Sequence, residues 1–233
     1  MLTPTQKLAE NLINVRERIA AACRGAGRSV TEITLLAVSK GQDGAAVAAA
    51  AKLGLCDFGE NYLQEALPKM ARLDTPLRWH FIGQLQSNKT SAVAENFAWV
   101  HTVDRVKLAE RLSAQRPAAL PPLNVSVQLK LGDEPSKGGV NASELIALLR
   151  AVHALPRLRL RGILCIPPEE SAPSRQRAWF VDARAAFDVA VAAGLPLDTL
   201  SMGMSGDLEA AIAARTTMLR IGTALFGPRP QSA

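Results

Sequence analysis

Residues 33–40 read Ile-Thr-Leu-Leu-Ala-Val-Ser-Lys, an apolar run that ends in a lysine, and Gly41-Gln42-Asp43-Gly44 follow it. An apolar run of this length, bounded by turn-forming residues, is typical of a strand that is buried on both faces. Lys40 would then lie at the carboxyl end of the strand, where poor hydration favours its neutral amine. A neutral amine can form a Schiff base with a carbonyl compound. The alternative is a lysine that only extends its ammonium group from a strand end to solvent.

A second group of small and polar residues follows two short apolar segments near the end of the chain. Residues 201–209 read Ser-Met-Gly-Met-Ser-Gly-Asp-Leu-Glu, and residues 220–223 read Arg-Ile-Gly-Thr. Loops of small residues expose backbone N–H groups, and a helix that starts behind them adds the positive end of its dipole. The pattern predicts a phosphate-binding loop, and an ordinary turn is the alternative.

Strand-like and helix-like segments alternate along the chain. Thr3 and Pro4 predict the start of an N-terminal helix, because a capping residue precedes a first-turn proline. Strands are expected at residues 33–39, 57–59, 78–82, 99–103, 125–131, 161–166, 199–202 and 218–221. Further helices are expected at about 42–53, 62–72, 85–96, 105–115, 142–153, 174–193 and 207–214.

This alternation predicts an α/β fold, a single (β/α)8 TIM-like barrel with an extra N-terminal helix. We expect one domain over residues 1–233, because the sequence contains no linker and no second core. An open, doubly wound sheet is the alternative, since the expected strand at 57–59 is short. Barrel active sites lie where the strands end. The residues that would share that face are Lys40, Glu60, Asn61, Gly83, Lys130 and those at 201–205 and 220–223.

Composition limits the class of protein. A hydrophobic fraction of 48% is ordinary for a globular chain, and the net charge of +6 is spread without a basic run, so we expect no nucleic-acid partner. Cys23, Cys56 and Cys165 are odd in number and widely spaced, and we interpret them as buried thiols rather than disulfides or zinc ligands. The N-terminus lacks a signal-peptide pattern, and no apolar stretch could span a bilayer. We therefore expect a cytoplasmic protein without a membrane partner.

Five motifs follow one another along the chain. They are residues 37–40 (AVSK), 58–62 (FGENY), 79–89 (WHFIGQLQSNK), 201–205 (SMGMS) and 220–227 (RIGTALFG). Their sequence and order resemble those of the YggS/PROSC family of pyridoxal 5′-phosphate (PLP) homeostasis proteins, over about residues 10–228. The resemblance implies a fold like the N-terminal barrel of alanine racemase. It also implies that PLP, the vitamin B6 cofactor, is held as a Schiff base on Lys40.

The resemblance implies a role for each residue of the cofactor site. Arg220 would face the pyridine nitrogen of PLP, and because a guanidinium does not give up a proton, PLP would be a weak electron sink. Asn61 would lie close to the cofactor, whereas His80 is interpreted as a hydrogen-bonded core histidine. No catalytic residue and no metal ligand is expected. The phosphate would be held by the hydroxyl and backbone donors of Ser205, Gly222 and Thr223.

Two classes of function are compared, a PLP carrier and a PLP-dependent amino-acid racemase. Two-base racemisation needs an acid/base group on each face of the cofactor, and alanine racemases take a tyrosine for this from a C-terminal domain. This chain has one tyrosine, Tyr62, and ends just after the expected barrel. We therefore expect a protein that binds PLP reversibly and carries or buffers it, without efficient catalysis. The racemase remains the alternative.

The expected partners follow from this interpretation. PLP is the ligand, PLP-dependent apoenzymes are candidate recipients, and the protein is expected to be a monomer. Binding of a polyanion or a protein through the basic surface is a third hypothesis.

Overall fold

Eight parallel strands form a closed barrel at the centre of the molecule. The computed structural model describes residues 2–73, 75–132, 138–168 and 172–228. The strands are β1 (Thr34–Val38), β2 (Asp57–Glu60), β3 (Arg78–Phe81), β4 (Trp99–Val103), β5 (Leu123–Leu129), β6 (Leu158–Cys165), β7 (Thr199–Ser201) and β8 (Met218–Ile221). Each strand pairs with the next, and β1 pairs with β8. This closure confirms the predicted barrel and excludes the open sheet.

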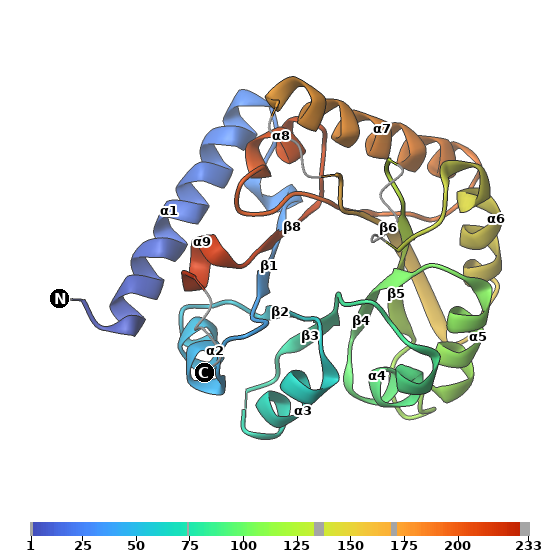
Figure 1. Ribbon diagram of the computed structural model, residues 1–233, viewed down its shortest axis with the longest axis horizontal. Helices are drawn as coiled ribbons and strands as arrows, with labels where there is room; N and C mark the ends of the chain where they lie inside the picture. The colour runs from blue at the N-terminus through green and yellow to red at the C-terminus, as the bar shows by residue number, and fades with distance from the viewer. Residues whose placement is uncertain (1, 74, 133–137, 169–171, 229–233) are drawn as a thin grey trace.

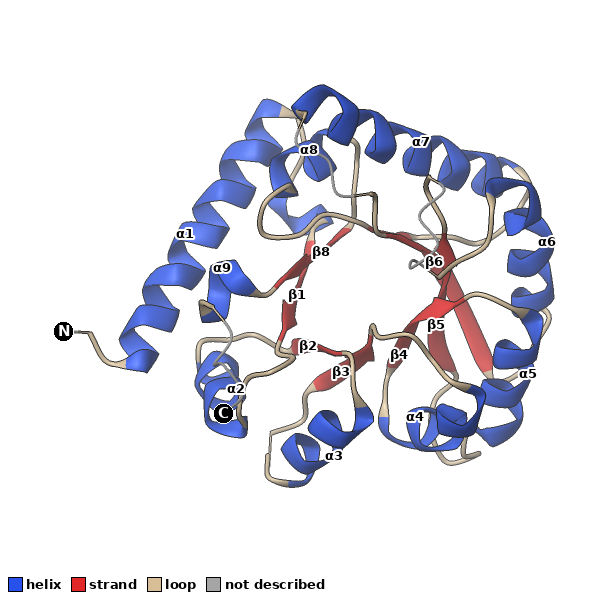
Figure 2. Cartoon of the chain, viewed as in Figure 1, coloured by secondary structure: helices blue, strands red, loops and turns tan. Residues whose placement is uncertain are grey.

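Helices connect successive strands and surround the barrel as an outer ring (Figures 1 and 2). They are α1 (Pro4–Gly25), α2 (Gly44–Lys52), α3 (Leu63–Ala71), α4 (Thr90–Asn96), α5 (Val106–Gln115), α6 (Ala142–His153), α7 (Pro173–Ala192), α8 (Leu208–Ala213) and α9 (Thr223–Phe226), with 3-10 turns η1 (Val30–Glu32) and η2 (Ser87–Lys89). The extra helix α1 packs against α8, α9 and α2, so it covers the seam where β8 meets β1.

The start of α1 matches the prediction. Thr3 Oγ1 accepts a hydrogen bond from Gln6 N–H, and the Gln6 side chain accepts one from Thr3 N–H. This reciprocal capping satisfies two backbone donors that the first helical turn leaves without partners.

The main apolar core lies between the barrel and the helices. Phe58, Leu149 and Phe180 are among its fully buried side chains. Burying a side chain of this size stabilises the fold by about 1.5–3 kcal/mol. The strand ends are therefore held on a rigid scaffold.

Several element boundaries differ from the expected ones. The predicted helix at 85–96 is shorter, because η2 precedes α4. β6 begins at Leu158, three residues before the predicted start, since Leu158 and Leu160 are buried while Arg159 is exposed. α9 was not predicted, because four residues are too few to show helical periodicity.

The prediction that all three cysteines are buried is wrong for one of them. Cys23 and Cys165 are buried, but Cys56 is exposed. It lies in the loop before β2, where an apolar neighbour such as Leu55 turns inward in its place. Of the two neighbours, Leu55 is therefore the one that is buried, and Cys56 faces solvent.

Within the described residues, no helix is long and apolar enough to cross a membrane. That residues 1–233 form a single domain stays a prediction.

Candidate functional site

One cavity at the carboxyl ends of the strands brings the predicted cofactor-site residues together. Its volume is about 240 Å³, and the predicted residues that line it are Lys40, Asn61, Ser205, Arg220, Gly222 and Thr223. Val38, Ile82 and Ile166 add apolar walls. The charged side chains among the described lining residues are both cations, Lys40 and Arg220, and no carboxylate accompanies them. Such a lining favours an anionic ligand.

Lys40 lies in a tight turn directly after β1. Gln42 N–H donates to the Ser39 carbonyl at 3.0 Å, which places Lys40 second in a four-residue turn. Gly41, the third residue, has a φ of +72°. A type II turn requires this conformation at its third position, and glycine adopts it without steric cost. The residues after Lys40 therefore fit the turn that presents the lysine.

Arg220 lies at the end of β8 with its side chain buried. Its guanidinium donates to the carbonyl and hydroxyl of Ser201 at 2.8 and 2.9 Å, and to the Cys165 carbonyl at 2.9 Å. These acceptors are neutral, so they orient the guanidinium without cancelling its charge. Burial lowers the pKa of Arg220, but an arginine side chain stays protonated in a protein.

Gly222 and Thr223 lie where β8 leads into α9, and Ser205, from the loop between β7 and α8, contacts the same helix start. Ser205 Oγ accepts a hydrogen bond from Ala224 N–H at 3.1 Å, and its hydroxyl hydrogen can be donated to another group. A Cβ on Gly222 would lie 3.3 Å from the Val38 carbonyl oxygen, so the backbone here passes close to the end of β1. Thr223 follows as the first residue of α9.

The loop that carries Ser205 is fixed from two sides. Gly203 has a φ of +92°, and a Cβ there would lie 2.5 Å from the Ala211 side chain, so α8 packs tightly under the loop. On the outside, Arg18 of α1 donates to the Ser205 carbonyl at 3.0 Å and pairs with Glu209 at 2.7 Å. The N-terminal helix thus helps to hold the loop in place.

Asn61 contributes a polar atom that lacks a partner. Its Oδ1 is buried and accepts no hydrogen bond from the described residues, and the residue lines the cavity. A buried acceptor left unsatisfied costs about 1–3 kcal/mol. A ligand with a donor group would remove this cost, so the lining fits a polar, anionic cofactor such as PLP.

Some strand-end residues lie outside the cavity. Glu60, Gly83 and Lys130 do not line it. The Lys130 N–H bonds the Val140 carbonyl at 2.9 Å, which joins the end of β5 to the segment before α6. The Lys130 backbone therefore supports the end of β5.

His80 is a hydrogen-bonded core histidine, as predicted. Its Nε2 lies 3.0 Å from Asp57 Oδ1, and its Nδ1 lies 2.9 Å from His101 Nε2. Arg78 pairs with the same Asp57 carboxylate through two contacts of 2.6 Å. Burial lowers the pKa of His80, although Asp57 opposes this. A neutral His80 donates from Nε2 to Asp57, so His101 donates from its Nε2 to His80 Nδ1.

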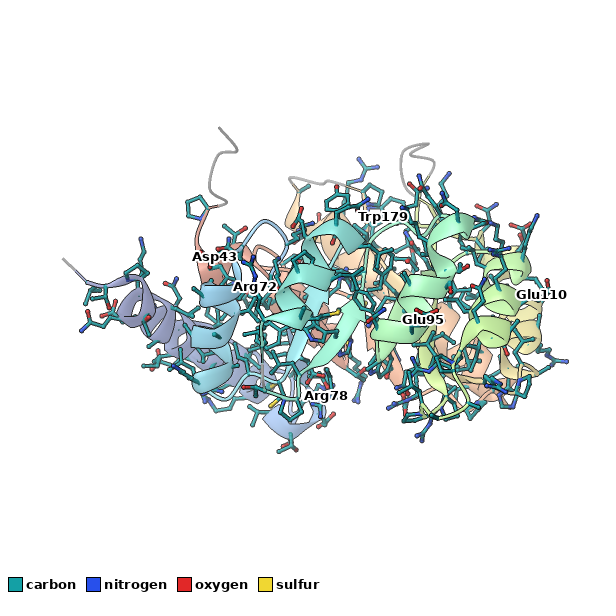
Figure 3. The ribbon with its side chains drawn as sticks, turned by 90° about the horizontal axis from the view of Figure 1, so that it is seen from below. Asp43, Arg72, Arg78, Glu95, Glu110 and Trp179 are labelled. Atoms are coloured by element: carbon teal, nitrogen blue, oxygen red, sulfur yellow. The ribbon has the colours of Figure 1, made fainter. Side chains whose placement is uncertain are left out.

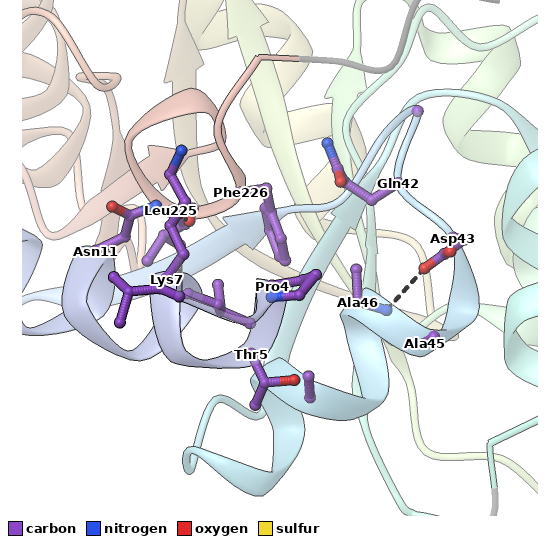
Figure 4. Close-up of a pocket in the computed structure, with 14 residues that line it drawn as sticks. Pro4, Thr5, Lys7, Asn11, Gln42, Asp43, Ala45, Ala46, Leu225 and Phe226 are labelled. Atoms are coloured by element: carbon purple, nitrogen blue, oxygen red, sulfur yellow. Dashed lines mark hydrogen bonds between the residues drawn. The ribbon is translucent and has the colours of Figure 1, made fainter.

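A larger cavity of about 800 Å³ lies beside the Lys40 turn (Figure 4). It shares Gly41 and Gln42 with that turn but none of the predicted cofactor-site residues. Its apolar wall includes Leu8, Leu225 and Phe226. Sequence reasoning missed it, because its walls come from α1, α2 and α9, which meet only in the folded chain.

Known proteins resemble this chain over almost its whole length. A family model described as alanine racemase, N-terminal domain, matches residues 8–230. The pyridoxal phosphate homeostasis protein of Pseudomonas aeruginosa is 54% identical over 227 residues, which cover 97% of each chain.

Solved structures agree with this result. PipY of Synechococcus elongatus, with PLP bound, has a TM-score of 0.83 at 35% identity, over 94% of this chain and 100% of PipY. Alanine racemase from Corynebacterium glutamicum shares the fold, with a TM-score of 0.70 at 18% identity, over 97% of this chain but 61% of the racemase. The resemblance seen in the five motifs is confirmed, and the chain belongs to the alanine racemase N-terminal domain family and, within it, to the pyridoxal phosphate homeostasis proteins.

Proposed function

We propose that this protein binds PLP in the cavity at the strand ends and carries or buffers it in the cytoplasm. This rests on one cavity whose described lining residues supply an amine, a guanidinium and two hydroxyls but no carboxylate. PLP offers an aldehyde to an amine and a phosphate to hydroxyl and N–H donors. The name of the Pseudomonas aeruginosa relative and the PLP bound to PipY support the same ligand.

Lys40 is the proposed anchor of the cofactor. Its neutral amine attacks the aldehyde carbon, a C=N double bond forms, and the aldehyde oxygen leaves as water with both amine hydrogens. Hydrolysis reverses the reaction, and neither direction needs an oxidant or a reductant. A bond of this kind suits a protein that must later release its ligand.

The remaining residues of the cavity bind and orient the ligand. Ser205, Thr223 and the Gly222 backbone are the proposed phosphate donors. Arg220 is proposed to face the ring nitrogen, where its fixed proton leaves that nitrogen unprotonated. Bound PLP would supply an electrophilic carbon but only a weak electron sink. This choice favours binding over turnover.

Among the described residues that line the cavity, none is a tyrosine that could serve a racemase as the second acid/base group. Tyr62, the one tyrosine of the chain, is 58% exposed and does not line the cavity. Racemisation needs a proton donor on the face opposite the lysine. We propose a monomer as the functional unit, and its mass in solution tests this.

A transfer assay combined with a racemase assay tests the proposal. The PLP-loaded protein should reactivate a PLP-dependent apoenzyme, and it should not interconvert the two forms of alanine or of other amino acids. Robust racemisation that disappears in Lys40→Ala would overturn the non-enzymatic function. Failure to take up PLP at all would overturn the binding function.

A further inference from the structure

A cluster of charged side chains lies behind the Lys40 turn, between the barrel and α3. It consists of Glu60 at the end of β2 and of Glu65 and Lys69 on α3. Glu60 is fully buried and Lys69 is 7% exposed. Removing charges from water is costly, and ion pairs at such depth often add no stability over apolar packing. None of the three lines the cofactor cavity, so their placement needs another explanation.

Glu60 points toward α3 rather than into the barrel. Side chains alternate along a strand, and the preceding residue, Gly59, faces the barrel interior. A Cβ on Gly59 would lie 3.0 Å from Ile82 and 3.4 Å from Leu36. The Glu60 carboxylate is therefore on the outer side of the strand ends, under the backbone of Lys40.

Lys69 and Glu60 together hold the residue that precedes Lys40. Lys69 Nζ lies 2.7 Å from Glu60 Oε1 and donates to the Ser39 carbonyl at 2.9 Å. The Ser39 hydroxyl donates to the same Glu60 oxygen at 2.6 Å. The Ser39 carbonyl belongs to the peptide group on the amino side of Lys40, so this peptide group is bound to a buried ammonium.

Glu65 holds the peptide group on the other side of Lys40. Its Oε2 accepts the Gly41 N–H at 2.8 Å and lies 3.9 Å from Lys69 Nζ. One helix thus binds both peptide groups that flank the Lys40 Cα. Fixing both of them fixes the two backbone torsions of Lys40, and with them the direction in which its side chain leaves the backbone.

We propose that Glu65 and Lys69 are positioning residues, which fix the Lys40 backbone so that its amine reaches the cofactor aldehyde. The inference rests on the proposed anchoring role of Lys40. Charge-assisted hydrogen bonds are stronger and more directional than apolar contacts. Apolar packing could hold α3 against the barrel, but it would leave the turn free to reorient.

Two ligands separate positioning from general stability. PLP can form the Schiff base, whereas pyridoxine 5′-phosphate has an alcohol in place of the aldehyde and binds only through noncovalent contacts. A misplaced Lys40 amine weakens the binding of PLP and leaves the binding of pyridoxine 5′-phosphate unchanged. A distorted cavity weakens the binding of both ligands.

Glu65 offers a matched pair of variants. Glu65→Ala removes the acceptor of the Gly41 N–H, and we expect it to weaken PLP binding about tenfold, as the loss of a charge-assisted hydrogen bond does. Glu65→Gln keeps an acceptor oxygen and should bind PLP nearly as the wild type does. Both should bind pyridoxine 5′-phosphate as the wild type does. Lys69 keeps its 2.7 Å contact with Glu60 in both variants, so neither variant leaves a buried charge without a partner.

Lys69 is tested by a double variant and a surface control. Glu60→Gln with Lys69→Met removes both buried charges at once, and should weaken PLP binding about tenfold or more. Lys52→Met is the control. Lys52 lies in the last turn of α2 and Lys69 in the last turn of α3, but Lys52 is exposed whereas Lys69 is buried. Lys52→Met should change neither the affinity for PLP nor that for pyridoxine 5′-phosphate. Thermal unfolding of each variant shows whether the fold is kept.

The outcomes are distinct. Wild-type PLP affinity in Glu65→Ala, or equal losses for both ligands, would overturn the positioning role, and the Glu65 pair decides this even if the double variant does not fold. Lys40→Ala is measured beside them. If Lys40→Ala keeps wild-type PLP affinity, the proposed anchor fails and the positioning role fails with it. If only Lys40→Ala loses affinity, the anchor stands without the positioning residues.

Discussion

The two ends of the barrel use polar side chains in different ways. At the amino-terminal end, Arg78, Asp57, His80 and His101 bind one another. At the carboxyl-terminal end, the described residues that line the Lys40 cavity include two cations and no carboxylate. Figure 3 shows these ends from the side, with Arg78 at one edge and Asp43, which follows the Lys40 turn, at the opposite edge.

Structural and functional polar groups can be told apart in this fold by what they bind. Groups that satisfy one another inside the protein hold the barrel together. Groups gathered around a cavity with an excess of one charge are suited to a ligand. Barrel proteins bind ligands at the carboxyl ends of their strands, and the distribution of charge here follows the same division.

The largest effect should come from breaking the amino-terminal network. Asp57→Ala should lower the free energy of unfolding by about 2–3 kcal/mol, because the buried His80 N–H loses its acceptor. Urea denaturation measures this loss. PLP affinity, measured below the unfolding transition, should stay within about twofold of wild type, as expected for distant sites. A large loss of affinity would show that the two ends are not separate.

A pH titration of stability should report on the same network. Burial lowers the pKa of His80, against the opposing effect of Asp57, and lowers that of His101 well below its usual value. Both histidines therefore bind a proton less readily in the folded state than in the unfolded chain, which protonates them near pH 6.5. The unfolded state then binds more protons, so stability falls as the pH drops below about 6.5, by up to about 1.4 kcal/mol per pH unit for each histidine.

The titration has a matched control. His101→Gln removes one titrating group but keeps an N–H donor for His80, so the slope between about pH 6.5 and 5.5 should become shallower. The pKa of Glu60 is raised, chiefly by burial. Its protonation in the folded state opposes the trend, but it does so in the wild type and in His101→Gln alike, so the difference between the two slopes reports on His101. An unchanged slope in His101→Gln would contradict the account of the network.

The smallest effect should come from one phosphate donor in the cavity. Ser205→Ala should weaken PLP binding by about fivefold, the usual value of one neutral hydrogen bond. Binding of pyridoxal, which lacks the phosphate, should not change. Equal losses for both ligands would place Ser205 outside the phosphate site.

Much of the fold was visible in the sequence, because buried parallel strands are apolar runs with clear boundaries. Residues 33–39 and 99–103 are examples, and the structure places β1 and β4 there. Ring closure is not a local property, since it depends on the pairing of β1 with β8 across the whole chain. The alternation of strands and helices over this length nevertheless favoured the barrel.

The cavity lining was also largely predicted, but its support was not. Strand-end positions and the family motifs together identified the residues from Lys40 to Thr223 that line the cavity. Glu65 and Lys69 stand four residues apart, which on a helix usually indicates a surface ion pair. Only the fold shows that Lys69 is buried and bonded to the Ser39 carbonyl.

The absorbance spectrum of the protein after incubation with PLP shows whether Lys40 anchors the cofactor. Wild type and the control Lys52→Ala should both show a band at about 420 nm, the usual position for PLP bound as a Schiff base. Lys40→Ala should lose this band while it keeps its thermal unfolding midpoint. An unchanged band in Lys40→Ala would contradict the account, because PLP would then be anchored elsewhere.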